Sequence, residues 1–187
     1  MDAPKLKKQK SLLRKELRLS LKGLNSSRRR LKSLRILRRL LATTIFKNSR
    51  YFFTYVSTED EADTRRLILA ALSQGKTVFL PRILKRNRME ACRIRRFPQD
   101  VKRGQYGILE PRSFCRRIPP ACLDLIVVPG LGFDRRGSRL GRGLGYFDRF
   151  LAKTRRAKKI GIAFREQMLK KIPTGPHDIP MDRVITD

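Results

Sequence analysis

The sequence is poor in the residues on which many catalytic and structural motifs depend. Its 187 residues contain one histidine, no tryptophan and three cysteines, and the cysteines show no Cys-x-x-Cys or Cys/His spacing. A disulfide framework and a zinc site are therefore not indicated, and a reducing cytoplasm is the expected location. No apolar run approaches the roughly 18 residues that a membrane span requires, so we expect a soluble protein without a membrane partner.

Acidic residues are also scarce. The chain has 16 Asp plus Glu against 46 Lys plus Arg, which gives a formal charge of +30, while 40% of its residues are hydrophobic. The length predicts a single domain over residues 1–187. The charge excess predicts an anionic partner such as nucleic acid, an acidic membrane surface or a nucleotide triphosphate. Basic residues that merely load the solvated faces are the alternative, and charge alone does not decide between them.

Glycines concentrate in one stretch that runs from Pro129 to Asp148. The apolar run Leu125–Val128 before it predicts a buried strand, and Tyr146–Thr154 after it predicts a helix. At a strand-to-helix junction, backbone N–H groups and the positive end of the helix dipole can face an anion. We therefore predict a phosphate-binding loop, with a flexible glycine loop as the alternative.

Charged neighbours favour the phosphate-binding interpretation of this stretch. Arg139 and Arg142 offer two cations that can pair with phosphate, and Asp148 offers a carboxylate that can bind magnesium. The loop glycines themselves are Gly141, Gly143 and Gly145.

Two helices are predicted before the first strand. Leucines recur at helical spacing between Pro4 and Gly23, and the segment Asn25–Ser27 predicts the N-cap of a second helix whose apolar face extends to Ile45. We expect the pair to form a helical hairpin. Lys10 and Arg14 lie one turn apart at the border of the first leucine stripe, where they can face a cleft or form a solvated flank.

Strands and helices alternate in the rest of the chain. Tyr51–Val56 and Thr77–Leu80, with a helix through Leu67–Leu72 between them, predict a right-handed βαβ unit with parallel strands. The strand before Pro81 is expected to end there. Further strands are predicted at 89–94, 160–164 and 183–186, a loop at 106–111 and a short helix at 165–171. This order predicts an α/β sheet covered by helices on both faces.

An acidic segment, Ser57–Thr64, precedes that predicted helix. Acidic residues at the start of a helix usually cap its N-terminus and interact favourably with the positive end of the helix dipole. Glu61 can also accept hydrogen bonds from the N–H groups of a ligand.

Six motifs in order along the chain resemble 5-formyltetrahydrofolate cyclo-ligase, a family also called 5,10-methenyltetrahydrofolate synthetase. The motifs are Glu61-Ala-Asp-Thr64, Leu80-Pro81, Gly107-Ile-Leu-Glu-Pro111, Pro129-Gly-Leu-Gly-Phe-Asp134, Arg139-Leu-Gly-Arg-Gly-Leu-Gly-Tyr-Phe-Asp-Arg149 and His177-Asp-Ile-Pro-Met-Asp-Arg-Val-Ile-Thr186. Each motif is weak alone, but the ordered set covers nearly the whole chain and is specific.

The resemblance implies a single-domain, three-layer α/β/α enzyme that uses Mg²⁺ and ATP to cyclise 5-formyltetrahydrofolate to 5,10-methenyltetrahydrofolate, with release of ADP and phosphate. In the family's mechanism the formyl oxygen attacks the γ-phosphate, and N10 of the folate then displaces phosphate. Such chemistry rests on positioning and charge neutralisation, which agrees with the lack of a Ser/His/Asp or Cys/His constellation. The single histidine, His177, is expected to be structural.

The resemblance also implies roles for individual residues. Arg139 and Asp148 are the implied catalytic residues, and Asp148 and Asp178 the implied metal ligands. Glu61 is similar to the residue that binds the pterin, and other residues would wall the folate site. The implied folate wall is Met89, Tyr106 and Glu110; the implied ATP contacts are Lys10, Arg14, Arg139, Gly141, Arg142, Gly143, Leu144, Gly145 and Tyr146.

Three loop positions depart from the family's Gly-Tyr-Gly-Gly-Gly-Tyr-Tyr-Asp pattern. Arg142, Leu144 and Phe147 stand where it has Tyr, Gly and Tyr. Arg142 adds a cation beside the expected phosphates, Leu144 puts a side chain into the loop, and Phe147 removes a hydroxyl group.

A basic nucleic-acid-binding protein remains the alternative function, because the two N-terminal helices are rich in cations. No nucleic-acid-binding module is present, and the aromatic residues fall in apolar strands, so we expect only non-specific binding. Oligomeric state leaves no signal in the sequence, and a monomer is the working expectation.

Overall fold

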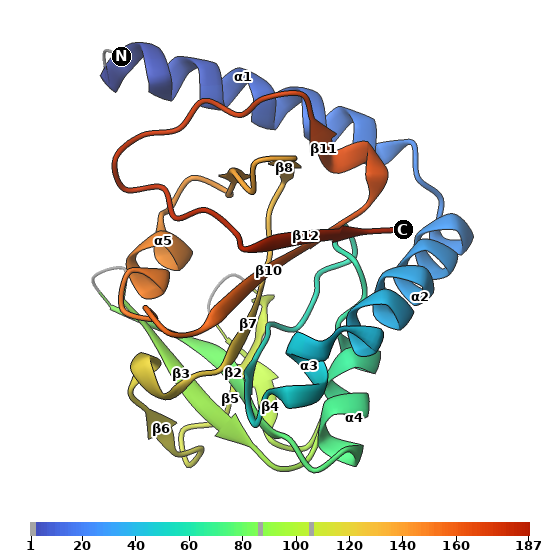
Figure 1. Ribbon diagram of the computed structural model, residues 1–187, viewed down its shortest axis with the longest axis vertical. Coiled ribbons are helices and arrows are strands. Elements are labelled where there is room, and N and C mark those ends of the chain that lie inside the picture. The colour runs from blue at the N-terminus through green and yellow to red at the C-terminus, as the bar shows by residue number, and fades with distance from the viewer. Residues whose placement is uncertain (1–2, 86–87, 105–106) are drawn as a thin grey trace.

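The computed structural model describes residues 3–85, 88–104 and 107–187. Its main sheet has seven strands in the order β12-β10-β7-β1-β2-β3-β6 (Figure 1). The first five in this order are mutually parallel, and β3 runs antiparallel to both of its neighbours. The predicted α/β class and the mainly parallel sheet are therefore confirmed. The strands of this sheet are β1 Tyr51–Phe53, β2 Thr77–Leu84, β3 Arg88–Ile94, β6 Arg117–Ile118, β7 Leu125–Val128, β10 Lys158–Ala163 and β12 Arg183–Thr186.

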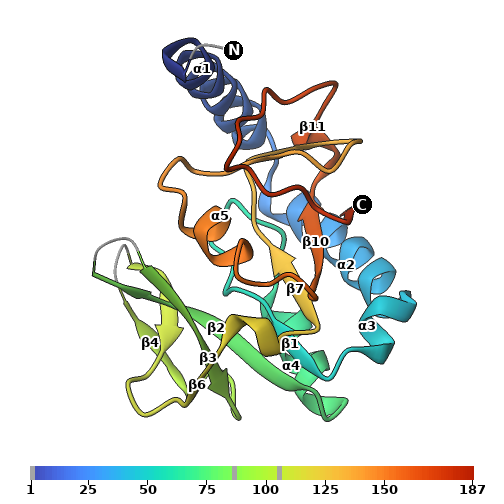
Figure 2. The same cartoon turned by 60° about the vertical axis from the view of Figure 1, so that its left-hand side comes forward.

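Apolar residues line both faces of the central strands. Along β7, Leu125 and Val127 join one core cluster, and Ile126 and Val128 join another. The first cluster packs under α2, α3 and α4, and the second under α5 (Tyr146–Leu151), on the opposite face (Figure 2). A strand that is buried on both faces reads as a continuous apolar run, which is why the sequence located β7 within its observed bounds.

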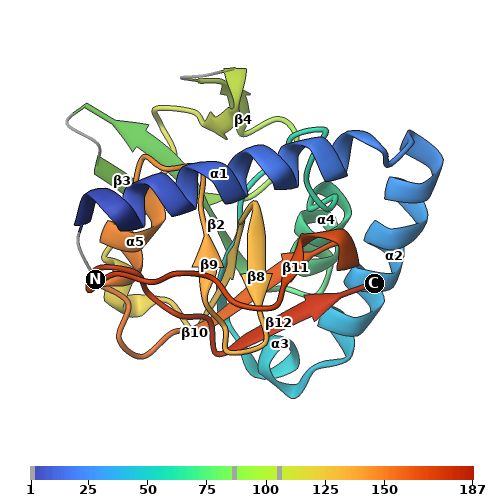
Figure 3. The same ribbon diagram turned by 90° about the horizontal axis from the view of Figure 1, so that it is seen from above.

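The N-terminal helices are α1 (Ala3–Lys22) and α2 (Ser26–Ala42), and Asn25 caps α2 as predicted by accepting a hydrogen bond from the Arg28 N–H. The predicted hairpin is open. From the turn the helices diverge, with α1 above the small sheet and α2 beside β12 (Figures 1 and 3). The second helix also ends earlier than predicted, because Thr43 caps a separate helix α3 (Thr44–Asn48), which contains Ile45.

Helix α4 (Arg65–Ser73) connects β1 to β2, and the predicted parallel βαβ unit is confirmed. The prediction that the strand ends at Pro81 is wrong, since β2 continues to Leu84 and pairs with β3 throughout. Pro81 is tolerated because β1 pairs with β2 only as far as Phe79, and beyond it no strand among the described residues pairs with that edge of β2. The predicted loop at 106–111 is partly wrong too, because Leu109–Pro111 forms β5, paired with β4 (Val101–Arg103).

A small sheet that the sequence did not predict follows β7. It consists of β8 (Gly132–Asp134), β9 (Arg139–Leu140) and β11 (Met168–Leu169), in the order β11-β8-β9. Leu140 of β9 and Leu131, just before β8, pack against Leu17 of α1. The short helix predicted at 165–171 is wrong, because a 3₁₀ turn, Arg165–Gln167, and strand β11 form there. Helix α5 is shorter than the predicted 146–154 helix. A second 3₁₀ turn spans Pro120–Cys122.

The order of the strands creates a switch point between β1 and β7. From β1 the chain proceeds through α4 to β2 on one side, and from β7 it proceeds to β10 and β12 on the other. In open parallel sheets, ligands bind outside the carboxyl ends of the strands at such a point. The segments that begin at Thr54 and Pro129 follow these two strands.

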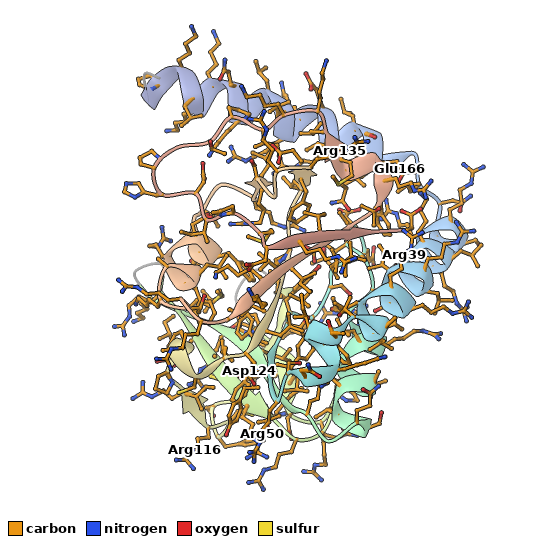
Figure 4. All side chains as sticks on the ribbon, in the orientation of Figure 1. Arg39, Arg50, Arg116, Asp124, Arg135 and Glu166 are labelled. Carbon is orange, nitrogen blue, oxygen red and sulfur yellow. The ribbon has the colours of Figure 1, made fainter. Side chains whose placement is uncertain are left out.

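Basic side chains project from every part of the fold. The labelled arginines of Figure 4 lie on α2, before β1, before β6 and after β8. The charge excess is therefore not confined to one face.

None of the helices in the described parts of the chain has the length and apolar character needed to cross a membrane.

Asp187 anchors the last strand to the rest of the protein. Its carboxylate accepts hydrogen bonds from Lys32 Nζ at 2.9 Å and from the Arg165 N–H at 3.0 Å, and the residue is 3% exposed. Burial raises the pKa of this carboxyl, but the hydrogen bonds outweigh that effect and lower the pKa below its usual value.

We expect Asp187→Asn to lower the free energy of unfolding at pH 7 by about 1–3 kcal/mol, since it removes one of the two carboxylates that pair with Lys32 and leaves only Glu166, at 2.8 Å. Because the folded-state pKa is lowered, the contribution of Asp187 is complete above the unfolded pKa of about 3.9 and is lost as pH falls through the folded pKa. Urea unfolding at pH 7 and pH 3 should therefore show a gap between wild type and variant that shrinks in acid. Asp60→Asn, at a 67% exposed side chain, is the control; an equal loss in both variants would contradict the prediction.

Candidate active site

A cleft of about 790 Å³ opens at the switch point. Its walls come from α1, from the segments that follow β1 and β7, from the glycine loop, and from the loop before β12. Except for Tyr106, all residues that the sequence analysis assigned to a site line this cleft. Tyr106 lies outside the described residues. The residues brought together are Lys10, Arg14, Glu61, Met89, Glu110, Arg139, Gly141, Arg142, Gly143, Leu144, Gly145, Tyr146, Asp148 and Asp178.

Helix α1 contributes two cations to the cleft. Arg14 Nε donates to the carbonyl oxygen of Gly141 at 2.8 Å, so the guanidinium both faces the cleft and holds the glycine loop. Lys10, one turn earlier, forms an ion pair with Asp178, whose Oδ2 also accepts from the Gly175 N–H at 2.6 Å. Burial lowers the pKa of Arg14, and the nearby Arg18 lowers it further. Both cations therefore face the cleft rather than forming a solvated flank.

Arg139 lies in the interior of the cleft wall, on β9. Its Nη2 donates to Asp148 Oδ1 at 2.6 Å, and its side chain is only 4% exposed. A Cβ on Gly141 would lie 2.7 Å from Arg139 Nη1, so that glycine leaves room for the guanidinium. The buried Nε of Arg139 has no hydrogen-bond partner among the described residues. This arginine is therefore held in place while part of its hydrogen-bonding capacity remains unused.

The glycine loop connects β9 to α5. Gly143 and Gly145 have φ of 109° and 66°, which an L side chain rarely adopts, and Leu144 between them is 53% exposed. The strand before the loop is β9 rather than β7, and α5 has six residues. A helix this short adds little dipole, so the attraction for an anion comes mainly from the arginines and Lys10.

Arg142 reaches from the loop to the segment after β1. Its Nη2 lies 3.0 Å from Glu61 Oε1 and 3.2 Å from Thr58 Oγ1. Glu61 Oε2 accepts from the Thr58 N–H at 2.9 Å. The guanidinium that was predicted beside phosphates is therefore paired, in this structure, with the carboxylate that was predicted to bind the pterin.

The other residues that were predicted to wall the folate site lie on the side of the cleft formed by β2 and β3. Met89, on β3, is half-buried and paired in register with Ile83. Glu110 Oε2 accepts from the Ile83 N–H at 3.0 Å, which fixes this carboxylate on the strand. Both residues line the cleft, as does His177.

Sequence reasoning missed Tyr55, Thr58 and a supporting role for Phe147. Tyr55 is 5% exposed and lines the cleft just after β1, and burial, followed by the charge of Glu61, raises its pKa well above the usual value. Phe147 packs edge-on against Phe53, and the Arg139 guanidinium lies 5.9 Å from its ring centre. Tyr55 was placed inside the predicted strand Tyr51–Val56, which is wrong at its end because β1 stops at Phe53. For Thr58, the position beyond the carboxyl end of an interior strand was the signal that could have identified it.

No group of three or more His, Cys, Asp or Glu in the described ranges could hold a metal ion by itself. Asp148 and Asp178 both line the cleft, and each is already paired with a cation. A metal ion would therefore need ligands from a substrate or from water. Magnesium commonly binds in that way, through one or two carboxylates and substrate phosphates.

A sequence model of the 5-formyltetrahydrofolate cyclo-ligase family matches residues 6–187. The chain belongs to the 5-formyltetrahydrofolate cyclo-ligase family. The mouse 5-formyltetrahydrofolate cyclo-ligase is 32% identical over 92% of this chain and 91% of its own length, and a probable cyclo-ligase from Caenorhabditis elegans is 31% identical over 96% and 93%.

The fold agrees with this assignment. An NMR structure of 5,10-methenyltetrahydrofolate synthetase from Aquifex aeolicus superposes on this chain with a TM-score of 0.84 at 32% identity. The superposition covers 94% of this chain and 88% of the Aquifex chain. The chain is therefore an enzyme of this family, and its relatives support cyclo-ligase activity on 5-formyltetrahydrofolate.

Proposed function

We propose that the chain cyclises 5-formyltetrahydrofolate to 5,10-methenyltetrahydrofolate at the expense of ATP, with release of ADP and phosphate. The observation that carries the proposal is the convergence of Lys10, Arg14 and Arg139 with the glycine loop on one wall of the cleft, with Glu61 among the residues that line the same cleft. Phosphoryl transfer needs such positioning and charge neutralisation more than it needs an acid or a base.

The cations of the cleft fit a triphosphate. Gly141 and Asp178 hold Arg14 and Lys10 at the surface of the cleft. Arg139 is fixed by Asp148, and its buried Nε has no hydrogen-bond partner in the part of the chain that the structure describes. Preorganised cations stabilise the charge that develops on the transferred phosphoryl group without reorganising during the reaction. The formyl oxygen would attack the γ-phosphorus, and N10 would then displace phosphate.

Asp148 fits a magnesium ligand, because its Oδ1 is used by Arg139 and its Oδ2 accepts no hydrogen bond within the described residues. Asp148 would hold magnesium there, and the bound ion would supply positive charge against the phosphate oxygens. We assign Asp178 first to the orientation of Lys10, and its role as a second metal ligand stays a prediction.

Glu61 is proposed to accept hydrogen bonds from the pterin N–H groups, and Met89 and Glu110 to wall the folate. Tyr106 is retained as a predicted contact. Three free cysteines, two of them buried, support the proposal of a reducing cytoplasm. A monomer is proposed, and nucleic-acid binding is proposed to be non-specific.

Purified protein should convert 5-formyltetrahydrofolate to a product with the near-ultraviolet absorbance of the methenyl compound only when both ATP and Mg²⁺ are present. Omission of either one should stop the reaction, and excess EDTA should stop it reversibly. ADP should appear in a one-to-one ratio with product. Ring closure without nucleotide, or at equal rate without divalent metal, would refute the proposal.

A further inference from the structure

We propose that the ion pair between Arg142 and Glu61 makes the binding of ATP and of the folate substrate mutually reinforcing. Each ligand needs one partner of this pair, so the first ligand to bind breaks it and the second binds without that cost. The inference rests on the proposed function, and it assigns Arg142 a role in coupling the two sites.

The pair engages the carboxylate that is proposed to bind the substrate. Arg142 Nη2 donates to Glu61 Oε1 at 3.0 Å, and the Thr58 N–H donates to Oε2 at 2.9 Å. The Glu61 side chain is 13% exposed. These two donors take up two of the roughly four acceptor positions of the carboxylate, so pterin N–H groups that approach Oε1 compete with Arg142 there.

The exposure of Arg142 and the glycines beside it allow its guanidinium to move away from Glu61. The Arg142 side chain is 48% exposed, and the residue lies between two glycines, of which Gly143 has φ of 109°. A Cβ on Gly143 would lie 3.5 Å from the Arg14 guanidinium, so the loop beside Arg142 runs close to a proposed phosphate contact. A guanidinium pairs bidentately with phosphate, which carries more charge than one carboxylate. A triphosphate therefore attracts Arg142 away from Glu61.

The coupling follows from linkage. If ATP draws Arg142 to its phosphates, Glu61 is released and folate affinity rises. If folate takes Glu61 first, Arg142 is released and ATP affinity must rise by the same factor. The factor is limited by the strength of a partly exposed ion pair, and we expect it to be about three- to tenfold.

Calorimetric titration of wild type with a non-hydrolysable ATP analogue and with 5-formyltetrahydrofolate, each alone and in the presence of the other, measures this factor. In Arg142→Gln, folate alone should bind about three- to tenfold more tightly than to wild type, and the analogue should no longer change that affinity. Arg142→Lys should retain part of the coupling, because it keeps the charge but loses the bidentate geometry.

Arg117→Gln is the matched control, since Arg117 pairs with Glu90 at 2.9 Å outside the cleft. It should leave the coupling at the wild-type value. Tight binding of both ligands to Arg142→Gln with unchanged coupling would overturn this inference while the proposed function stands. Failure of wild type to bind either ligand would overturn both.

Discussion

Asp148→Asn is expected to lower the rate of ATP-dependent ring closure at least about 100-fold, with the protein still folded. Asp148 holds the Arg139 guanidinium through a 2.6 Å bond, and it is the proposed magnesium ligand. The amide keeps the shape of the side chain but removes its charge, so it weakens both functions at once. Loss of a charged hydrogen bond at a site of charge development costs about 2.7–4 kcal/mol, which corresponds to a factor of 100–1000.

The variant should be measured by initial rates of methenyl product at saturating ATP, over a range of Mg²⁺ concentrations, with circular dichroism to verify the fold. If Asp148 binds the metal, the Mg²⁺ concentration for half-maximal rate should rise as kcat falls. Glu90→Gln is the control, because Glu90 also pairs with arginines, is 15% exposed, and does not line the cleft. Full activity in Asp148→Asn would show that Asp148 neither binds the metal nor supports the reaction.

The sequence predicted strands β7 and β12 with their observed bounds. β7 was predicted because all of its residues are buried, which gives a continuous apolar run. The small sheet of β8, β9 and β11 was missed, because strands of two or three residues leave no periodic pattern. The continuation of β2 past Pro81 was missed because it depends on where β1 ends, which is a tertiary fact.

The sequence predicted which residues belong to the candidate site, but not which of them pair with one another. Lys10 with Asp178 and Arg142 with Glu61 are separated by 168 and 81 residues, and no local pattern connects them. The glycine loop illustrates the same limit. Its lack of side chains suggested close approach of a phosphate, whereas the space beside Gly141 accommodates Arg139. The residue types indicated the chemistry, and the tertiary structure determined which of these groups pair with one another.

Arg14→Ala should raise the KM for ATP about 10- to 100-fold. Arg14 is a proposed phosphate contact, and its Nε also holds the glycine loop through the carbonyl oxygen of Gly141 at 2.8 Å. A charged hydrogen bond contributes about 1.5–3 kcal/mol, and every 1.4 kcal/mol corresponds to a factor of ten. If the arginine also stabilises the charge on the transferred phosphoryl group, kcat should fall together with the rise in KM.

Arg18→Ala is the control for Arg14→Ala. It tests whether the rise in the KM for ATP comes only from the loss of one positive charge on α1. Arg18 lies one turn further along α1, is exposed and does not line the cleft. Its removal should leave the KM for ATP within about twofold of wild type, because exposed charges are strongly screened at physiological salt. Equal effects of the two substitutions would mean that α1 attracts ATP only through its overall charge. A rise in KM confined to Arg14→Ala would instead require a specific contact, since both variants remove one positive charge from the same helix.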